Sequence, residues 1–294
     1  RFLMPPPSQF LPSNGYGMAF IPFRKVTNLL LAIGCSKSVL KELDERMKTH
    51  SIIFALAVFF LWSTASTAEP THKDIRYSKQ YARSVLDLWT VDSEKLAPLV
   101  VYFHGGGFKV GDKAGFGRSQ MLRKYHSKGV AFASVNYPFL VNTNKDYFKI
   151  MNHCAEAVRF LQANAKKYNF DKTRISVSGG SAGALISCHI GHGHDLGIRS
   201  VFSIQQPMGT PLLTYPKLRK GGPAIILYNH SGPNDKVHHP DNATLVHKRC
   251  KELDVVSALY GSRQSDLPEL PSGLKLHDVA MKFFFQSWEL PFPR

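Results

Sequence analysis

Short runs of apolar residues alternate with segments of helical spacing over the last two thirds of the chain. Leu99–Phe103 is apolar throughout, which is typical of a strand buried on both faces. Ser84–Val91 alternates apolar and polar positions, as a half-exposed strand does. The other strand-like runs are Val130–Val135, Arg174–Val177, Arg199–Ile204, Ala224–Tyr228 and Val255–Tyr260.

Helical patterns separate several of these runs. Phe148–Ala165 carries apolar residues at helical spacing, so we expect a crossover helix there. Two more helices are expected, one from His239 to Leu253 and one over Asp278–Trp288. This alternation predicts an α/β fold with a mostly parallel central sheet and helices on both faces. The short connection before Ala224 leaves no room for a bulky lid, so the cap should be minimal.

The N-terminal part follows a different pattern. Residues 1–46 are an irregular mixture, Pro-rich at the start, which we expect to be an upstream extension outside the fold. Met47 then opens a short positive segment, an apolar run and a small-residue stretch that ends at Ala68. This is the pattern of a secretory signal peptide. Residues 47–68 are therefore predicted to be a signal peptide, and residues 69–294 the folded domain of a secreted or periplasmic protein.

Two alternatives for this region are weaker. A lipoprotein attachment site at Leu30–Cys35 would leave the second apolar run, Ile52–Trp62, unexplained. That second run is also shorter than the roughly 20 residues that a transmembrane helix needs. We therefore expect no stable membrane span.

Charge and cysteine content narrow the classes of function. Lys and Arg outnumber Asp and Glu by 37 to 21, a formal net charge of +16. The basic residues are dispersed and accompany no nucleic-acid-binding motif, so no nucleic-acid partner is expected. No cysteine belongs to a CxxC pair, which argues against zinc and thioredoxin-like sites. Cys154, Cys188 and Cys250 lie in predicted helices and are expected to be buried thiols, although a disulfide between two of them remains open in an oxidising compartment.

Two glycine-rich motifs each follow a buried strand. His104–Phe108 reads HGGGF and comes directly after Leu99–Phe103. Gly179–Gly183 reads GGSAG and comes directly after Arg174–Val177, leading into an apolar helix start. Either motif alone arises by chance, but the pair in this order and at these strand ends indicates a catalytic site.

The chemistry of the two motifs is complementary. Ser181, on a tight strand-to-helix turn, needs small neighbours and would stand as a nucleophile at the top of the sheet. The backbone N–H groups of Gly105 and Gly106 can turn inward because glycine has no Cβ. Together with the Ala182 N–H, at a helix N-terminus, they could form an oxyanion hole.

HGGGF followed by GGSAG resembles the HGGG-type carboxylesterases and lipases of the α/β-hydrolase superfamily, those similar to hormone-sensitive lipase. The resemblance covers roughly residues 74–290. It implies the order nucleophile, acid, histidine, and hydrolysis of carboxylic esters with neither metal nor cofactor. The sequence departs from the family at Gly180, where many relatives have Asp.

The resemblance also indicates where the acid should lie. Gly232–Val237 is similar to the GxxDxV pattern of the family, which makes Asp235 the candidate acid. The alternative is an ordinary turn aspartate. Asp241 is the reserve candidate, although it looks better placed as a helix cap.

The histidine is expected after the last strand, just before the terminal helix. His277 is the candidate base, with a surface histidine at a helix start as the alternative. His238 and His239, beside the acid loop, are interpreted as structural. A metal site that includes them and His230 has no regular ligand spacing to support it.

These observations predict a serine carboxylesterase in which His277 takes the proton of Ser181 and Asp235 orients the imidazole. The expected substrates are small or exposed esters, free or linked to a polysaccharide, with acetyl esters of carbohydrates as a narrower version. The rivals are a peptidase of the same fold and a non-catalytic or decayed binding protein. The binding-protein alternative predicts that His277 and Asp235 do not converge on Ser181.

Overall fold

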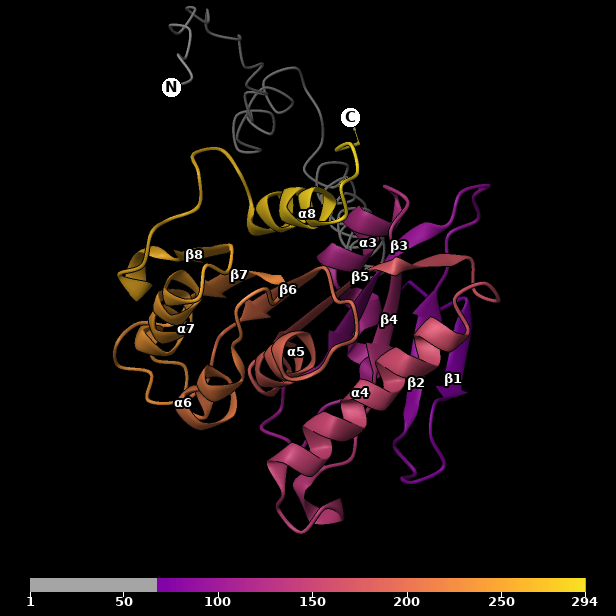
Figure 1. The fold of residues 1–294 in the computed structure, drawn as a ribbon, viewed down its shortest axis with the longest axis horizontal. Helices are drawn as coiled ribbons and strands as arrows, with labels where there is room; N and C mark the ends of the chain where they lie inside the picture. The colour runs from indigo at the N-terminus through magenta and orange to yellow at the C-terminus, as the bar shows by residue number, and fades with distance from the viewer. Residues whose placement is uncertain (1–67, 294) are drawn as a thin grey trace, which may run out of the picture. The chain divides into compact units, whose positions relative to one another are not determined.

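The computed structural model describes residues 68–293, so the predictions for residues 1–46 and for almost all of 47–68 lie outside the described residues. The described chain folds around one eight-stranded sheet (Figure 1). Its strands are β1 His72–Arg76, β2 Val85–Trp89, β3 Ala97–Phe103, β4 Ala131–Val135, β5 Phe170–Gly180, β6 Ser200–Ile204, β7 Ala224–Asn229 and β8 Ser257–Gly261.

The helices are mostly short. The α-helices are α3 Gln120–His126, α4 Tyr147–Ala163, α5 Ala182–Gly193, α6 Thr210–Leu213, α7 Pro240–Glu252 and α8 Leu276–Ser287. Short 3₁₀ turns are η1 Lys113–Arg118, η2 Leu140–Asn142, η3 Tyr215–Lys217 and η4 Arg263–Ser265. Within residues 68–293, no helix is long and apolar enough to cross a membrane.

The strand order is β1-β2-β4-β3-β5-β6-β7-β8. β1 and β2 are antiparallel to their neighbours, and every pair from β4 to β8 is parallel. The prediction of a mostly parallel sheet is therefore confirmed. Because the carboxyl ends of parallel strands share one edge, the loops after β3, β5, β6 and β7 meet there, which is where ligands bind in open α/β sheets.

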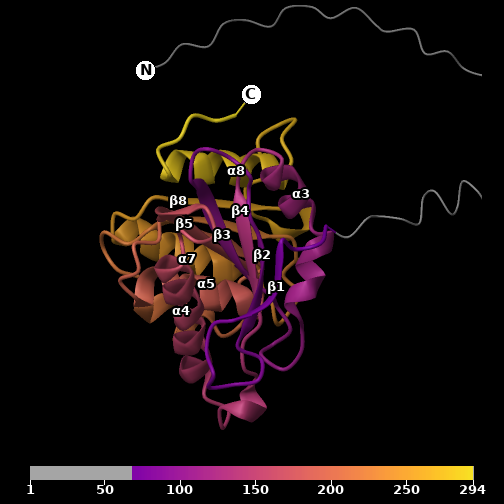
Figure 2. The same ribbon diagram turned by 90° about the vertical axis from the view of Figure 1, so that its right-hand side faces the viewer.

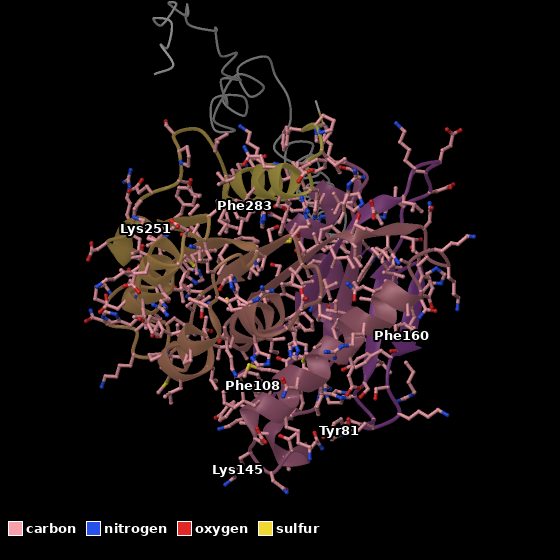
Figure 3. All side chains as sticks on the ribbon, viewed as in Figure 1. Tyr81, Phe108, Lys145, Phe160, Lys251 and Phe283 are labelled. Atoms are coloured by element: carbon pink, nitrogen blue, oxygen red, sulfur yellow. The ribbon has the colours of Figure 1, made fainter. Side chains whose placement is uncertain are left out.

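Helices cover both faces of the sheet. α3 and α8 lie on one face, and α4, α5 and α7 on the other (Figures 1 and 2). In Figure 3, the labelled Phe283 of α8 and Phe160 of α4 lie on opposite sides of the sheet.

Strand β3 shows why the apolar run is continuous. Leu99, Val101 and Phe103 belong to the core cluster under α4 and α5, whereas Val100 belongs to the cluster under α3 and α8. All four side chains are fully buried. Alternate residues of a strand point to opposite faces, so burial on both faces requires an apolar residue at every position.

Local signals set several helix boundaries. The Asp146 side chain accepts the N–H of Lys149 at the start of α4, and the Ser119 side chain accepts that of Met121 at the start of α3. Pro240 occupies the first turn of α7, where its missing N–H removes no helical hydrogen bond. Cys154, Cys188 and Cys250 are buried and free, and burial raises the pKa of the Cys188 thiol to about 12.

Candidate active site

Ser181 connects β5 to α5 in a backbone conformation that few residues other than glycine adopt. Its φ is 55° and its ψ is −117°, a strain of about 1–3 kcal/mol that the surroundings must offset. The Ser181 N–H donates to the carbonyl of Ile204 at 3.0 Å, which ties the turn to the end of β6. The turn therefore holds Ser181 at the carboxyl edge of the sheet.

Close backbone packing explains the glycines on either side of the serine. A Cβ on Gly179 would lie 2.4 Å from the Gly183 carbonyl oxygen, and a Cβ on Gly183 would lie 2.0 Å from that of Phe103. By contrast, a Cβ on Gly180 would meet only the Ile204 carbonyl oxygen, at 3.9 Å. Glycine is thus required at 179 and 183, as expected, and the Asp of many relatives would fit at 180.

The histidine that meets Ser181 is His238. Its Nε2 lies 2.9 Å from the Ser181 Oγ, and its Nδ1 lies 3.4 Å from Oδ2 of Asp235. With the Nδ1–H tautomer, His238 donates toward Asp235 and accepts the hydroxyl proton of Ser181. A histidine nitrogen within hydrogen-bond reach of the serine is the geometry that a serine nucleophile requires.

The prediction of His277 as the base is wrong. His277 lies in the first turn of α8, where its carbonyl accepts the Tyr125 hydroxyl of α3 at 2.7 Å. Its side chain lines a hollow between these two helices, with Gln120 and Lys124 among its neighbours. The family order led to the last histidine of the chain, but the helix begins one residue before it and directs it toward α3.

From the sequence, His238 is interpreted as a structural residue because it lies beside the acid loop, and so it is not identified as the base. A signal was present: it lies three residues after Asp235 in a sequence with strong turn character. A turn of that length brings the side chain of its last residue back to that of its first. His277 does not converge on Ser181, as the binding-protein alternative predicted, but His238 lies between Ser181 and Asp235.

Asp235 lies where the sequence placed the acid. Its Oδ1 accepts the backbone N–H groups of Val237 and His238, each at 2.9 Å. The His238 N–H, followed by the hydroxyl of Ser231, holds the pKa of the Asp235 carboxyl well below its usual range. Hydrogen bonds to the charged form stabilise the carboxylate, so Asp235 stays ionised and orients the imidazole.

Gln205, at the end of β6, holds the acid loop from one side. Its Oε1 accepts the N–H of His230 at 2.8 Å, and its Nε2 donates to the Ser231 Oγ at 2.7 Å. Gln205 itself is almost fully buried and has a φ of 56°. A series of contacts thus runs from Gln205 through Ser231 to Asp235, and onward to His238.

Asn229, at the end of β7, binds the loop that carries Asp235 and His238. It is fully buried, and its Nδ2 donates to the His238 carbonyl at 3.0 Å. The N–H of Met208 also donates to the carbonyl of Val237 at 2.7 Å. His238 is therefore fixed by its backbone as well as by Asp235.

The HGGG loop lies directly against the serine turn. A Cβ on Gly105 would lie 2.9 Å from the Gly180 carbonyl oxygen and 3.5 Å from the Ser181 Cβ. Gly106 has a φ of 108°, which only glycine adopts readily. Within residues 68–293, the N–H groups of Gly105, Gly106 and Ala182 donate to no backbone carbonyl, so they remain free for a ligand.

Polar and aromatic side chains bind the backbone around the HGGG loop. The Tyr137 hydroxyl donates to the His104 carbonyl at 2.6 Å, and the two rings stack with centroids 4.3 Å apart. Arg83 donates to the carbonyls of Tyr137 and Gly111. Among residues 68–293, these contacts hold the backbone of the loop and leave the N–H groups of Gly105 and Gly106 unbonded.

The remaining candidates have structural contacts. Nε2 of His230 lies 3.2 Å from Nε2 of Gln205, and His239 caps α7 by accepting the N–H of Asp241. Asp241 is therefore not the helix cap but an exposed residue of the first turn. In the described part of the chain, no three His, Cys, Asp or Glu residues form a group that could hold a metal ion.

Comparisons with known proteins find esterases among the proteins that this chain resembles. Residues 86–198 match the BD-FAE family. The carboxylesterase NlhH of Mycobacterium tuberculosis is 31% identical over 90 residues, which cover 31% of this chain and 27% of that protein. Gut esterase 1 of Caenorhabditis elegans is 29% identical over 99 residues, covering 31% of this chain and 17% of that protein.

Solved structures extend the likeness over most of the described chain. A truncated carbohydrate esterase from gut microbiota superposes with a TM-score of 0.62 at 14% identity, covering 76% of this chain and 99% of that one. This chain has the α/β-hydrolase fold. The apo form of Thermogutta terrifontis esterase 2 gives a TM-score of 0.61 at 17% identity, over 78% of this chain and 97% of that one.

The fold that the resemblance to HGGG-type esterases implies is confirmed. The matched segment of this chain spans less than a third of the length of NlhH or gut esterase 1. Its activity and substrates are therefore inferred from the site itself.

Proposed function

We propose that this protein hydrolyses carboxylic esters through an acyl-enzyme on Ser181. The observation that carries the proposal is the 2.9 Å approach of His238 Nε2 to the Ser181 Oγ, on a strained strand-to-helix turn with Asp235 behind the histidine. Named esterases among the relatives support the same reaction class.

In this mechanism His238 accepts the hydroxyl proton as the Ser181 oxygen attacks the ester carbonyl. The Gly105, Gly106 and Ala182 N–H groups stabilise the negative oxygen of the tetrahedral intermediate, each worth roughly 3 kcal/mol. His238 then gives its proton to the departing alkoxide, and an alcohol leaves. Water, activated by the same histidine, hydrolyses the acyl-serine and restores the enzyme.

The surroundings of the site favour small or exposed esters. Val110, beside the glycine loop, and Met208 and Val237, beside the histidine, are exposed apolar side chains. Their exposure supports small or exposed esters as the substrates. Acetyl esters of carbohydrates are the narrower proposal, supported by the likeness to a carbohydrate esterase.

The test is hydrolysis of p-nitrophenyl esters from C2 to C12 by the wild-type protein and by Ser181→Ala. We expect turnover of the shorter esters that falls by about 10⁴-fold or more in the variant. A fluorophosphonate probe should label the wild type alone. Thermogutta terrifontis esterase 2, for comparison, is phosphonylated by cyclosarin. A folded wild type that neither turns over an ester nor takes the label would overturn the proposal.

Export remains a proposal that rests on the sequence of residues 47–68. Expression in a secreting host followed by N-terminal sequencing tests it. We expect the mature protein to begin close after Ala68, and retention of Met47 at the N-terminus of the exported protein would contradict the signal peptide.

A further inference from the structure

The hollow that His277 lines has a chemistry that ester hydrolysis does not use. It has a volume of about 360 Å³ and lies between α3 and α8. Its lining residues are Gln120, Arg123, Lys124, Lys275 and His277. None of them belongs to the catalytic group, and α5, which begins after Ser181, covers the opposite face of the sheet (Figure 1).

Positively charged side chains line this hollow, and few carboxylates lie near enough to balance them. Lys124 pairs with Asp278, which also accepts the backbone N–H of Lys275. Within residues 68–293, neither Arg123 nor Lys275 forms an ion pair. One carboxylate therefore faces three cationic side chains, and the excess positive charge is exposed at the mouth of the hollow.

His277 adds a polar atom without a partner. Its Nδ1 is buried and, among the described residues, has no hydrogen-bond partner. Burial, followed by the Lys124 charge, lowers the pKa of the imidazole. An anion in the hollow would offset the Lys124 charge and would accept hydrogen bonds from the surrounding donors.

We propose that this hollow is a binding site for an oxyanion group, phosphate or sulfate, either as the free ion or as part of a larger molecule. Arg123 would bind two oxygens at once, since a guanidinium presents paired donors, and Lys275 would act as a mobile point charge. Gln120 contributes an amide donor, and the start of α8 contributes the positive end of the helix dipole. The volume equals roughly ten waters, which leaves space beyond the ion itself for an attached group.

The test is calorimetric titration of inorganic phosphate into the purified full chain and into Arg123→Gln/Lys275→Gln. Lys248→Gln/Lys251→Gln is the matched control, since it removes the same charge from the exposed surface of α7, where Figure 3 labels Lys251. We expect saturable binding that weakens by about tenfold or more in the hollow variant and by less than about twofold in the control. Circular dichroism should show that all three proteins are equally folded.

A second arm identifies the source of the anion. Inorganic sulfate is compared with a sulfated oligosaccharide, in the same three proteins. Tighter binding of the oligosaccharide that is lost in the hollow variant points to a group carried on a larger molecule, and equal binding points to the free ion. Absence of saturable binding at tens of millimolar phosphate, or equal weakening in both variants, would overturn the site. Neither arm depends on ester hydrolysis.

Discussion

At the scale of single residues, the site depends on how closely backbone segments approach one another around Ser181. The carbonyl of Phe103 lies where a side chain at 183 would begin, and Gly105 lies against the Gly180 carbonyl. These contacts bring the glycine loop and the serine turn together so that their N–H groups can share one oxyanion.

Because of this close packing, a substitution by alanine should be far more damaging at Gly183 than at Gly180. Gly183→Ala would place a Cβ 2.0 Å from the Phe103 carbonyl oxygen, so we expect a loss of about 1–3 kcal/mol of unfolding free energy together with most of the esterase activity. Gly180→Ala is the matched control, because the nearest atom lies 3.9 Å away. Urea unfolding and ester hydrolysis measure both variants. Equal effects of the two substitutions would contradict the steric account.

The same scale shows what the sequence could reveal about the site. The glycines and Ser181 were predictable because their roles follow from local sterics beside a strand whose burial is visible in its composition. Asp235 followed from a family pattern. His238 did not, since choosing among histidines requires knowing which way each side chain points, and that is set by the turn at Asp235 and by Asn229.

At the scale of elements, the loop that carries Asp235 and His238 is held between the ends of β6 and β7. Gln205 binds it from β6 and Asn229 from β7. Both strands are pinned in a parallel register. The base and the acid are therefore held by contacts from the same two strands.

Gln205 should act as a positioning residue through this loop. In Gln205→Leu the Ser231 hydroxyl loses its donor, so we expect kcat to fall by about tenfold or more with little change in KM. Gln264→Leu is the control, because Gln264 binds the same loop at the His230 carbonyl but does not contact Ser231. Steady-state kinetics on a short p-nitrophenyl ester distinguish the two. A proportional rise in KM alone would argue against positioning.

A buried ion pair ties η1 to the antiparallel edge of the sheet. Lys113 is 4% exposed and lies 2.7 Å from carboxylate oxygens of both Asp87 and Asp74. Lys113→Met would leave the buried Asp87 without its counter-charge, so we expect a loss of about 3–5 kcal/mol of unfolding free energy. Asp74→Asn, at the exposed partner, should cost less than about 1 kcal/mol. Urea denaturation measures both, and similar losses would contradict the buried-pair account.

Elements with strong patterns were predicted and weak ones were missed. β3, β7, α4 and α7 match their predicted ranges to within a few residues, because their apolar positions form a continuous run or a helical stripe. The pattern did not predict α3, because this helix is only seven residues long and rich in cationic residues. It did not predict β1, because that strand is mostly exposed. Their positions depend on tertiary contacts, such as that between Tyr125 and α8.

At the scale of the whole molecule, buried neutral histidines link stability to pH. Burial, followed by nearby positive or titratable groups, lowers the pKa values of His189 and His192 to about 4. In the unfolded chain these side chains titrate near pH 6.5. The unfolded state therefore binds protons first as the pH falls, and stability declines from about pH 6.5 to about pH 4.

Replacing these histidines should flatten that decline. We expect the wild type to lose up to roughly 3 kcal/mol for each histidine across the window, and His189→Leu/His192→Leu to lose less over the same range. His72→Gln, at an exposed position, is the control variant. Urea unfolding at pH 7, 5.5 and 4 provides the comparison, and parallel curves for all three proteins would exclude these groups as the cause.

The most direct test of the account compares two histidines in one assay. His238→Gln and His277→Gln are assayed on the p-nitrophenyl ester that the wild type hydrolyses fastest. We expect His238→Gln to lose about 10⁴-fold in kcat, as removal of a triad base does, and His277→Gln to stay within about twofold of the wild type. The reverse ranking, with activity lost at His277 and retained at His238, would contradict the assignment of Ser181, His238 and Asp235 as the catalytic group.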